Sequence, residues 1–298
     1  MILSALSPLL RLPGVADLTR QTLLNMDPET AHASTITALR LGLAPQQDRA
    51  DPPELKISLC GLELVNPIGM AAGFDKNAEV PRPLGLMGFG MVEIGTVTPR
   101  PQQGNPRPRL FRVAAAEGVI NRMGFNNEGH DAVFERLRNL RVPAALGVNI
   151  GANKDSDDFV ADYVLGVRRF ADLADYLTVN ISSPNTPGLR NLQADEALRR
   201  LLGEVLAARA KARTRVPVLL KIAPDLDEAA LDNIAAVIEA TDLDGLIVSN
   251  TTISRDSVAG LENAAETGGL SGKPLFELST RRLAQMRQRV GTLPIVGV

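Results

Sequence analysis

The 298-residue sequence has no tryptophan, one cysteine and two histidines, and each shortage excludes a class of protein. A single cysteine, Cys60, excludes an internal disulfide and favours a reducing compartment. His32 and His130 lie far apart without metal-ligand spacing, so no zinc or di-iron site is predicted. The net charge is −2 with no block of like charges, which gives no support to a nucleic-acid partner. No apolar run approaches the roughly 20 residues that cross a bilayer.

A repeating order of short apolar strands and helices fills most of the chain. Helical periodicity is clear over 196–212 and 227–240. Strands that alternate with helices pair in parallel, and seven of them favour a (β/α)8 TIM barrel over an open sheet. The expected strands are 68–72, 91–95, 146–150, 176–181, 218–222, 245–249 and 295–298.

The eighth strand of such a barrel is missing, and the sequence stops within an apolar strand at Val298. A domain seldom ends on a buried strand without the helix that covers it. We therefore expect an incomplete form of a longer barrel, lacking the last strand and helix, whose open edge is an aggregation hazard.

Residues 1–45 differ from the rest and are expected to form a small helical extension, with the barrel over 46–298. Asp27-Pro28-Glu29 is a strong helix start, because aspartate caps the helix and proline fits its first turn. An apolar patch over 2–10 lacks the basic start and the cleavage motif of a signal peptide. Such helices either pack onto the following domain or lie on a membrane surface. A short hairpin, turning at Cys60-Gly61, is expected to follow.

Polar side chains stand at the expected carboxyl ends of six strands, where barrels of this kind bind their ligands. They include two lysines, Lys76 and Lys221, with several carboxamides and hydroxyls, but no histidine, cysteine or carboxylate pair. Metal-assisted hydrolysis, glycoside hydrolysis and thiol chemistry therefore lack their groups. Amides and hydroxyls suit a planar ligand such as a flavin or a pyrimidine, and lysines suit an anion. Each residue alone is equally typical of an ordinary strand end.

Two loops complete the expected site. The strand ending at Ile181 runs into a segment that Pro184 and Pro187 make rigid, a good holder for a polar ligand, although serine, proline and asparagine also form ordinary turns. The segment 118–127 is too rich in asparagine and glycine for a strand. We expect it to be a loop that serves as a lid or substrate clamp, or simply a turn before a helix near Asp131.

Six sequence blocks closely resemble dihydroorotate dehydrogenases, and the match looks like the membrane-associated, quinone-reducing class. The resemblance runs from about Met26 to the last residue in family order. It implies an FMN-dependent oxidation of dihydroorotate to orotate in pyrimidine synthesis. The blocks are 71–77, 93–101, 121–127, 180–186, 221–225 and 268–272.

The resemblance also implies roles for individual residues. Ser183 matches the base that removes the C5 proton while C6 passes hydride to flavin N5, and soluble classes carry a cysteine there. A serine hydroxyl is a poor base, so the proton must be passed on to a polar network or to water. The implied substrate set is Lys76, Asn121, Arg122, Met123, Gly124, Phe125, Asn180, Asn185, Asn250 and Thr251. The implied cofactor set is Ala72, Gly73, Phe74, Asp75, Lys76, Thr96, Asn149, Asn180, Lys221, Ser249 and Gly272, with Lys221 near flavin N1.

In the quinone-reducing class a helical pair forms a tunnel from the membrane to the flavin. The resemblance therefore implies peripheral contact with the cytoplasmic side of the inner membrane. His32 and Arg100 are the candidates for the quinone end, although His32 is equally typical of a helix surface. The family's flavin phosphate partly binds beyond Val298. One alternative is therefore a truncated remnant that only binds ligand or membrane, and another is a related flavin barrel acting on a different pyrimidine or on uridine in tRNA.

Overall fold

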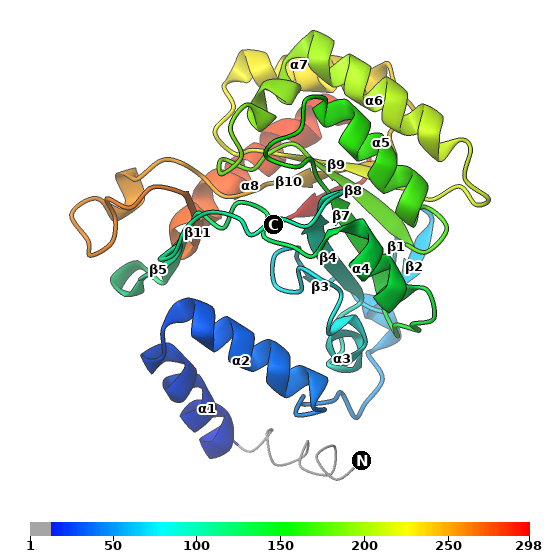
Figure 1. Cartoon of the computed structure of the whole chain (residues 1–298). Helices are drawn as coiled ribbons and strands as arrows, with labels where there is room; N and C mark the ends of the chain where they lie inside the picture. The colour runs from blue at the N-terminus through cyan, green and yellow to red at the C-terminus, as the bar shows by residue number, and fades with distance from the viewer. Residues whose placement is uncertain (1–12) are drawn as a thin grey trace.

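The computed structural model describes residues 13–298, and its centre is a curled parallel sheet (Figure 1). The strand order across this sheet is β12-β10-β9-β8-β7-β4-β3, and every neighbouring pair is parallel. The strands are β3 (Gly69–Met70), β4 (Met91–Val97), β7 (Ala145–Ile150), β8 (Tyr176–Asn180), β9 (Val218–Ile222), β10 (Gly245–Val248) and β12 (Ile295–Gly297). All seven expected strands are confirmed, and they follow one another in the sequential order of a barrel. Within residues 13–298, β3 and β12 do not pair with each other, so the sheet is open between them.

Helices cover the outer side of the sheet because each carries one apolar face. The helices of the barrel are α3 (Pro81–Leu86), α4 (Gly129–Leu137), α5 (Phe159–Phe170), α6 (Asp195–Arg209), α7 (Glu228–Glu239) and α8 (Lys273–Val290). The helices expected over 196–212 and 227–240 are confirmed as α6 and α7, and the one expected near Asp131 is confirmed as α4. Strands β4, β7, β8, β9 and β10 are almost wholly buried between these helices and the sheet interior.

A hairpin closes the amino-terminal end of the sheet. Strands β1 (Ile57–Leu59) and β2 (Leu62–Leu64) pair antiparallel around the turn predicted at Cys60-Gly61. The side chain of Leu64 is buried against Tyr176 and Leu219 from the parallel strands. Apolar side chains therefore pack against this end of the sheet, and the large cavity lies at the opposite end, at the carboxyl ends of the strands.

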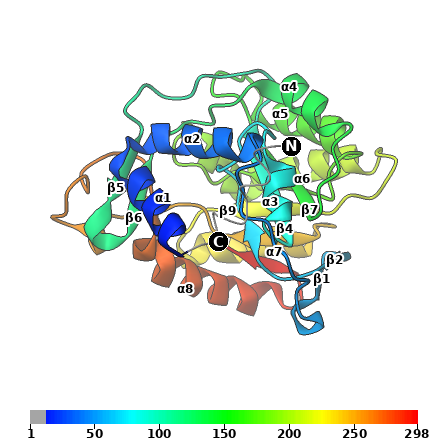
Figure 2. The same cartoon turned by 90° about the horizontal axis from the view of Figure 1, so that it is seen from below.

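Two helices precede the barrel, α1 (Pro13–Asn25) and α2 (Pro28–Arg40), and they lie apart from α5, α6 and α7 in Figure 1. The predicted cap is confirmed, because the Asp27 carboxylate accepts hydrogen bonds from the amide and the hydroxyl of Thr30, both at 2.9 Å. Figure 2 shows the pair with β5 (Leu110–Val113) close to α2. Within residues 13–298 no helix is both long and apolar enough to cross a membrane. The apolar patch over 2–10 lies outside the described residues, and the boundary at 45/46 stays a prediction.

The prediction that 118–127 contains no strand is wrong. Residues Gly118–Asn121 form β6, which pairs antiparallel with β5 on one side and with β11 (Gly269–Gly272) on the other. Ile120 is fully buried in a small apolar cluster beneath this three-stranded sheet. Hydrogen bonds to two partners and one buried side chain outweigh a poor strand composition, because strand preference depends on context.

Candidate functional site

A cavity of about 1040 Å³ opens at the carboxyl ends of the parallel strands. It is lined from below by strand ends and from the sides by α2, by the segment after β6 and by the start of α8. Eighteen of the residues expected to bind cofactor, substrate or quinone line this single cavity. They are His32, Ala72, Gly73, Phe74, Lys76, Thr96, Asn121, Met123, Gly124, Phe125, Asn180, Ser183, Asn185, Lys221, Ser249, Asn250, Thr251 and Gly272.

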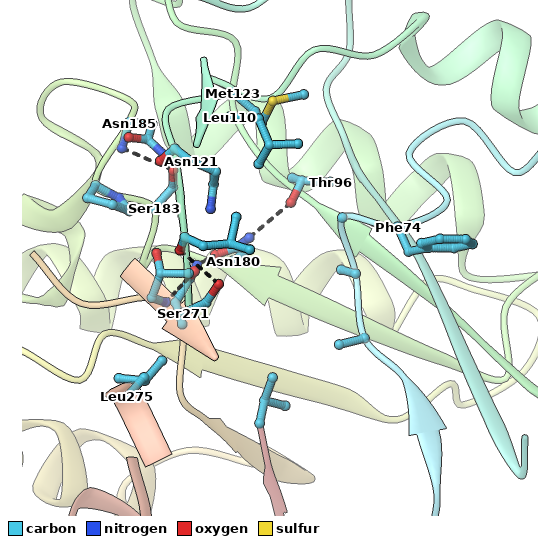
Figure 3. A pocket seen from close by; sticks show the side chains of 18 of the residues that line it. Phe74, Thr96, Leu110, Asn121, Met123, Asn180, Ser183, Asn185, Ser271 and Leu275 are labelled. Atoms are coloured by element: carbon cyan, nitrogen blue, oxygen red, sulfur yellow. Dashed lines mark hydrogen bonds between the residues drawn. The ribbon is translucent and has the colours of Figure 1, made fainter. Parts of the chain in front are cut away.

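The bottom of the cavity is a buried polar network that we name the floor: Glu93, Thr96, Asn149, Thr178, Asn180 and Lys221. Thr96 Oγ1 donates to Asn149 Oδ1 at 2.5 Å and accepts from Asn180 Nδ2 at 2.9 Å, as Figure 3 shows for Thr96 and Asn180. Below them, the Glu93 carboxylate accepts from Asn149 Nδ2 and Thr178 Oγ1, each at 2.8 Å. These bonds fix which edge of each carboxamide faces the cavity.

The two lysines are held differently. Lys76 Nζ donates to the carbonyl of Gly73 at 2.7 Å, and burial lowers the pKa of Lys76 to about 8. Lys221 is buried and its ammonium group makes no hydrogen bond within residues 13–298. Burial lowers the pKa of Lys221, and the negative charge of Glu93 opposes this shift. Both groups would gain from an anion in the cavity, because a buried cation is costly without a partner.

Ser183 lies in the loop after β8, and its side chain lines the cavity beside Asn121 and Asn185 (Figure 3). Its Oγ accepts a hydrogen bond from the amide of Asn185 at 3.2 Å. Asn185 Nδ2 in turn donates to the carbonyl of Asn121 at 3.2 Å. The loop therefore joins the floor to the segment after β6. Thr186, in the same loop, has a buried hydroxyl with no partner within the described residues.

Asn180 and Asn250 are oriented by a second hydroxyl, that of Ser182. Ser182 Oγ donates to Asn180 Oδ1 at 2.8 Å and accepts from Asn250 Nδ2 at 2.9 Å. These bonds fix the orientation of both side-chain amides, and so the positions of their N–H and carbonyl groups. Such a fixed arrangement recognises the edges of a planar ring that carries both carbonyl and N–H groups.

His32 of α2 lines the cavity next to Phe74. Its Nε2 donates to the carbonyl of Phe74 at 2.6 Å, and the two rings meet edge to face. Burial, and then the charge of Lys76, lower the pKa of His32, so this imidazole is neutral at pH 7. A neutral ring beside an aromatic side chain suits an apolar or weakly polar ligand at this end of the cavity.

Four expected residues do not line the cavity. Asn149 lies beneath it in the floor, and the buried carboxylate of Asp75 accepts hydrogen bonds from the backbone amides of Glu79 and Val80. The side chain of Arg122 pairs with Glu266 at 2.6 Å, so only the backbone of this residue is near the site. Arg100 forms an exposed pair with Asp155. Three other arginines contact the N-terminal helices: Arg107 and Arg109 pair with Glu29 of α2, and Arg112 donates to the carbonyls of Leu23, Leu24 and Met26 at and just after the end of α1.

The sequence did not point to every residue of the site. Glu93 was hidden inside a strand, although a carboxylate in an otherwise apolar strand is a signal of a buried partner. Glu29 lines the cavity because it shares a face of α2 with His32, three residues later. Asn126 also lines the cavity, and its Oδ1 atom is buried with no partner in residues 13–298. In the same range no group of three histidine, cysteine, aspartate or glutamate side chains is placed to hold a metal ion.

Comparison with known proteins agrees with this site. The family model described as dihydroorotate dehydrogenase matches residues 54–298. The dihydroorotate dehydrogenase (quinone) of Rhizobium rhizogenes is 60% identical over 287 residues, which cover 95% of this chain and 79% of the relative. The protein of the same name from Agrobacterium fabrum is 57% identical and covers 94% of this chain and 78% of its own length. The crystal structure of DHODH from Eimeria tenella in complex with ferulenol has a TM-score of 0.87 at 42% identity, covering 91% of this chain and 80% of that one.

Proposed function

The chain belongs to the dihydroorotate dehydrogenase family, and from this we propose that it oxidises dihydroorotate to orotate in pyrimidine synthesis, with a quinone as electron acceptor. One observation carries the proposal most directly. A single cavity gathers Lys76, Ser183 and Lys221 with the amides and hydroxyls that a flavin and a pyrimidine both need. The described lining of this cavity includes no cysteine, and its two carboxylates already pair with basic side chains, Glu29 with Arg109 and Glu117 with Lys273.

We infer that the flavin is FMN, because the floor offers amide, hydroxyl and ammonium groups to a flat ring with carbonyl and N–H edges. A Cβ atom on Gly73 would meet no atom within 4 Å, so the backbone there borders open space that a ring can fill. Lys221, a buried residue, supplies an ammonium group to the lining of the same cavity. The chemistry that FMN supplies when bound is acceptance of a hydride from dihydroorotate and return of the electrons to the quinone. The proposed contacts are Ala72, Gly73, Phe74, Thr96, Asn180, Lys221, Ser249 and Gly272, with Asp75 and Asn149 supporting them from outside the cavity.

Ser183 is the proposed base for the proton on C5 of dihydroorotate. Its Oγ already accepts a hydrogen bond from the amide of Asn185, and this N–H stabilises negative charge that develops on the oxygen. A serine hydroxyl gives up its own proton reluctantly, so the proton needs an onward path. The unpartnered hydroxyl of Thr186 in the same loop offers the start of that path through water.

The substrate ring is proposed to lie between the asparagines and the segment after β6. Asn121, Asn180, Asn185 and Asn250 present oriented amides to its carbonyl and N–H edges, with Thr251 beside them. The Lys76 ammonium group attracts the carboxylate of the substrate. Met123, Gly124 and Phe125 border the same space, with the backbone of Arg122 leading into them.

The N-terminal helices are the proposed quinone and membrane side. Leu18 and Leu24 of α1 are 65% and 50% exposed, and Leu41 after α2 is 53% exposed. Exposed leucines on a helical pair suit shallow insertion into a lipid surface, so we place the protein as a peripheral protein on the cytoplasmic side of the inner membrane. His32 remains the candidate for the quinone end, since it is the member of the predicted pair that lines the cavity.

The activity is tested by incubating the purified chain with FMN, dihydroorotate and a soluble quinone while following orotate absorbance. We expect a yellow protein whose orotate formation requires the quinone. A protein that stays colourless after FMN is supplied would contradict the proposal. A yellow protein that binds orotate without turnover would favour the alternative of a binding module.

The membrane contact is tested separately with anionic phospholipid vesicles. We expect a variant with Leu18→Ser and Leu24→Ser to lose most co-sedimentation with the vesicles. Leu165→Ser is the matched control, because Leu165 is 47% exposed on α5, away from the N-terminal helices. Equal sedimentation of the two variants would contradict membrane contact through α1.

A further inference from the structure

Three consecutive backbone carbonyls in the segment that borders the substrate space are held by one neighbouring stretch of chain. Asn105 donates from Nδ2 to the carbonyl of Arg122 at 2.9 Å and from its amide to the carbonyl of Met123 at 3.0 Å. Gln102 Nε2 donates to the carbonyl of Gly124 at 3.0 Å. The position of the segment 121–125 is therefore dictated by residues 102–105, which do not themselves line the cavity.

Residues 102–105 are held in turn by a buried arginine. Arg109 Nη1 donates to the carbonyls of Gln103 and Asn105 at 2.6 and 2.9 Å. Gly104 lies between them with a positive φ of 76°, and a Cβ there would come within 2.2 Å of the Met123 carbonyl and 2.9 Å of Arg109 Nη1. Only glycine permits this close approach. The carbonyl of Arg109 also accepts from the amide of Arg122 at 2.9 Å.

The other side of the Arg109 guanidinium binds the N-terminal extension. Nη2 donates to Glu29 Oε1 at 2.7 Å, and Nε lies within 3.3 Å of both carboxylate oxygens. The Arg109 side chain is only 7% exposed and that of Glu29 16% exposed, so this pair is shielded from solvent. Arg109 lowers the pKa of Glu29, which keeps the carboxylate charged. All three nitrogens of one planar group thus join α2 to the chain behind the substrate segment.

We propose that Arg109 is a positioning residue that couples helix α2 to the segment 121–125 and so sets the affinity for the substrate. The inference rests on the proposed function, since it takes this segment to close over dihydroorotate. It assigns the N-terminal extension a second role beyond the quinone and the membrane. A shift of α2 would move Glu29, then Arg109, then the carbonyls that hold Asn121 and Phe125 at the cavity.

The neighbouring Arg107 supplies a matched control. It donates to the same Glu29 oxygen at 3.0 Å, but its side chain is 73% exposed and it makes no bond to residues 102–105. Arg109→Lys keeps the positive charge near Glu29 and Lys76, yet an ammonium group cannot reach Glu29 and two carbonyls in one plane. Arg107→Gln removes a charge from the exposed side of the same carboxylate.

The experiment measures orotate binding by calorimetry, dihydroorotate kinetics and hydrogen–deuterium exchange on the full chain with FMN. For Arg109→Lys we expect roughly a tenfold rise in the Kd of orotate and in the KM of dihydroorotate, with a smaller change in kcat, because charge-assisted hydrogen bonds are lost. Amide exchange should rise in 102–105 and 121–125 and stay unchanged in α6. Arg107→Gln should stay within about twofold of the parent.

A second variant guards against loss of folding in Arg109→Lys. Asn105→Asp keeps the shape of the side chain but replaces the donor that faces the Arg122 carbonyl with an acceptor, so it should shift binding and exchange in the same direction. Equal orotate affinity and equal exchange in Arg109→Lys, Asn105→Asp and Arg107→Gln would overturn the coupling. Failure of the parent chain to bind orotate would instead overturn the proposed function, so the two failures are distinct.

Discussion

The floor of the cavity and its loop wall, defined as residues 102–105, Arg109 and 121–125, are built in opposite ways. In the floor, buried side chains from adjacent strands hydrogen-bond to one another, as Asn149 does with Thr96 and Glu93. In the loop wall, side chains hold backbone carbonyls, and an arginine ties the whole stretch to a helix some 80 residues earlier in the chain. The floor is held by sheet register, whereas the loop wall is held by side-chain bonds to backbone carbonyls, from Gln102, Asn105 and Arg109.

This difference assigns separate tasks to the two regions. Because the side chains of the floor are already hydrogen-bonded to one another, the floor can hold a cofactor in one orientation through many turnovers. A wall held through Glu29 and Arg109 can respond to what happens at the N-terminal helices, where a quinone or a membrane is proposed to bind. Ser183 stands where the two regions meet, because its loop follows β8 and Asn185 reaches Asn121.

The largest expected effect comes from removing the proposed base at this meeting point. Ser183→Ala should lower turnover at neutral pH by about 10²- to 10⁴-fold, the usual contribution of a positioned base, while the flavin spectrum stays unchanged. Stopped-flow reduction of the bound flavin by dihydroorotate measures the step directly. Ser182→Ala is the comparison, since Ser182 orients Asn180 and Asn250 and should mainly raise KM. Parental turnover by Ser183→Ala would remove Ser183 as the base.

The next prediction compares a carboxylate of the floor, Glu93, with one that pairs with the loop wall, Glu266. Glu93→Gln removes the charge facing buried Lys221 and turns an acceptor toward Asn149 or Thr178 into a donor. The free energy of unfolding should fall by roughly 1–3 kcal/mol, because a buried hydrogen bond to a charged group is lost. Glu266→Gln breaks a half-exposed pair with Arg122 and should cost no more than about 1 kcal/mol.

Urea unfolding at a matched FMN concentration distinguishes these two variants. A larger loss for Glu266→Gln than for Glu93→Gln would reverse the comparison. It would show that the loop wall, and not the floor, is the region on which global stability depends.

The same contrast explains what could be predicted from the sequence. The floor was largely predictable, because parallel strands place their carboxyl ends at one edge and so bring Thr96, Asn180 and Lys221 together. The loop wall could not be predicted, because Arg109 contacts residues to which it is not related by helical or strand periodicity. The resemblance placed Arg122 in the substrate set, but only the structure shows its side chain turned toward Glu266.

One wrong prediction and one side-chain position that the sequence could not give have the same physical origin. Residues Gly118–Asn121 have a poor strand composition and become a strand only because partners from distant parts of the chain lie on both sides. Arg100 was chosen for its place in a conspicuous block, yet its side chain reaches Asp155 at the surface. A long arginine side chain can point several ways from one backbone position, so sequence position alone does not fix its partner.

The smallest expected effect is the pH dependence of orotate binding, which tests whether Lys76 meets the ligand carboxylate. Burial lowers the pKa of Lys76 to about 8 in the free protein, below its ordinary 10.5. An anionic ligand favours the protonated lysine and so raises this pKa on binding. Affinity should therefore be full below pH 8 and fall by about tenfold per pH unit above it, until the pKa of the complex is reached.

Calorimetric titration of orotate between pH 6.5 and 9.5 measures this dependence. Lys76→Met should bind orotate more weakly at pH 7 and show a flat profile, because the titrating charge is gone. Asn250→Ala, which removes a polar contact without a charge, should weaken binding and keep the slope. A flat profile in the parent chain would mean that Lys76 does not face the carboxylate of the ligand.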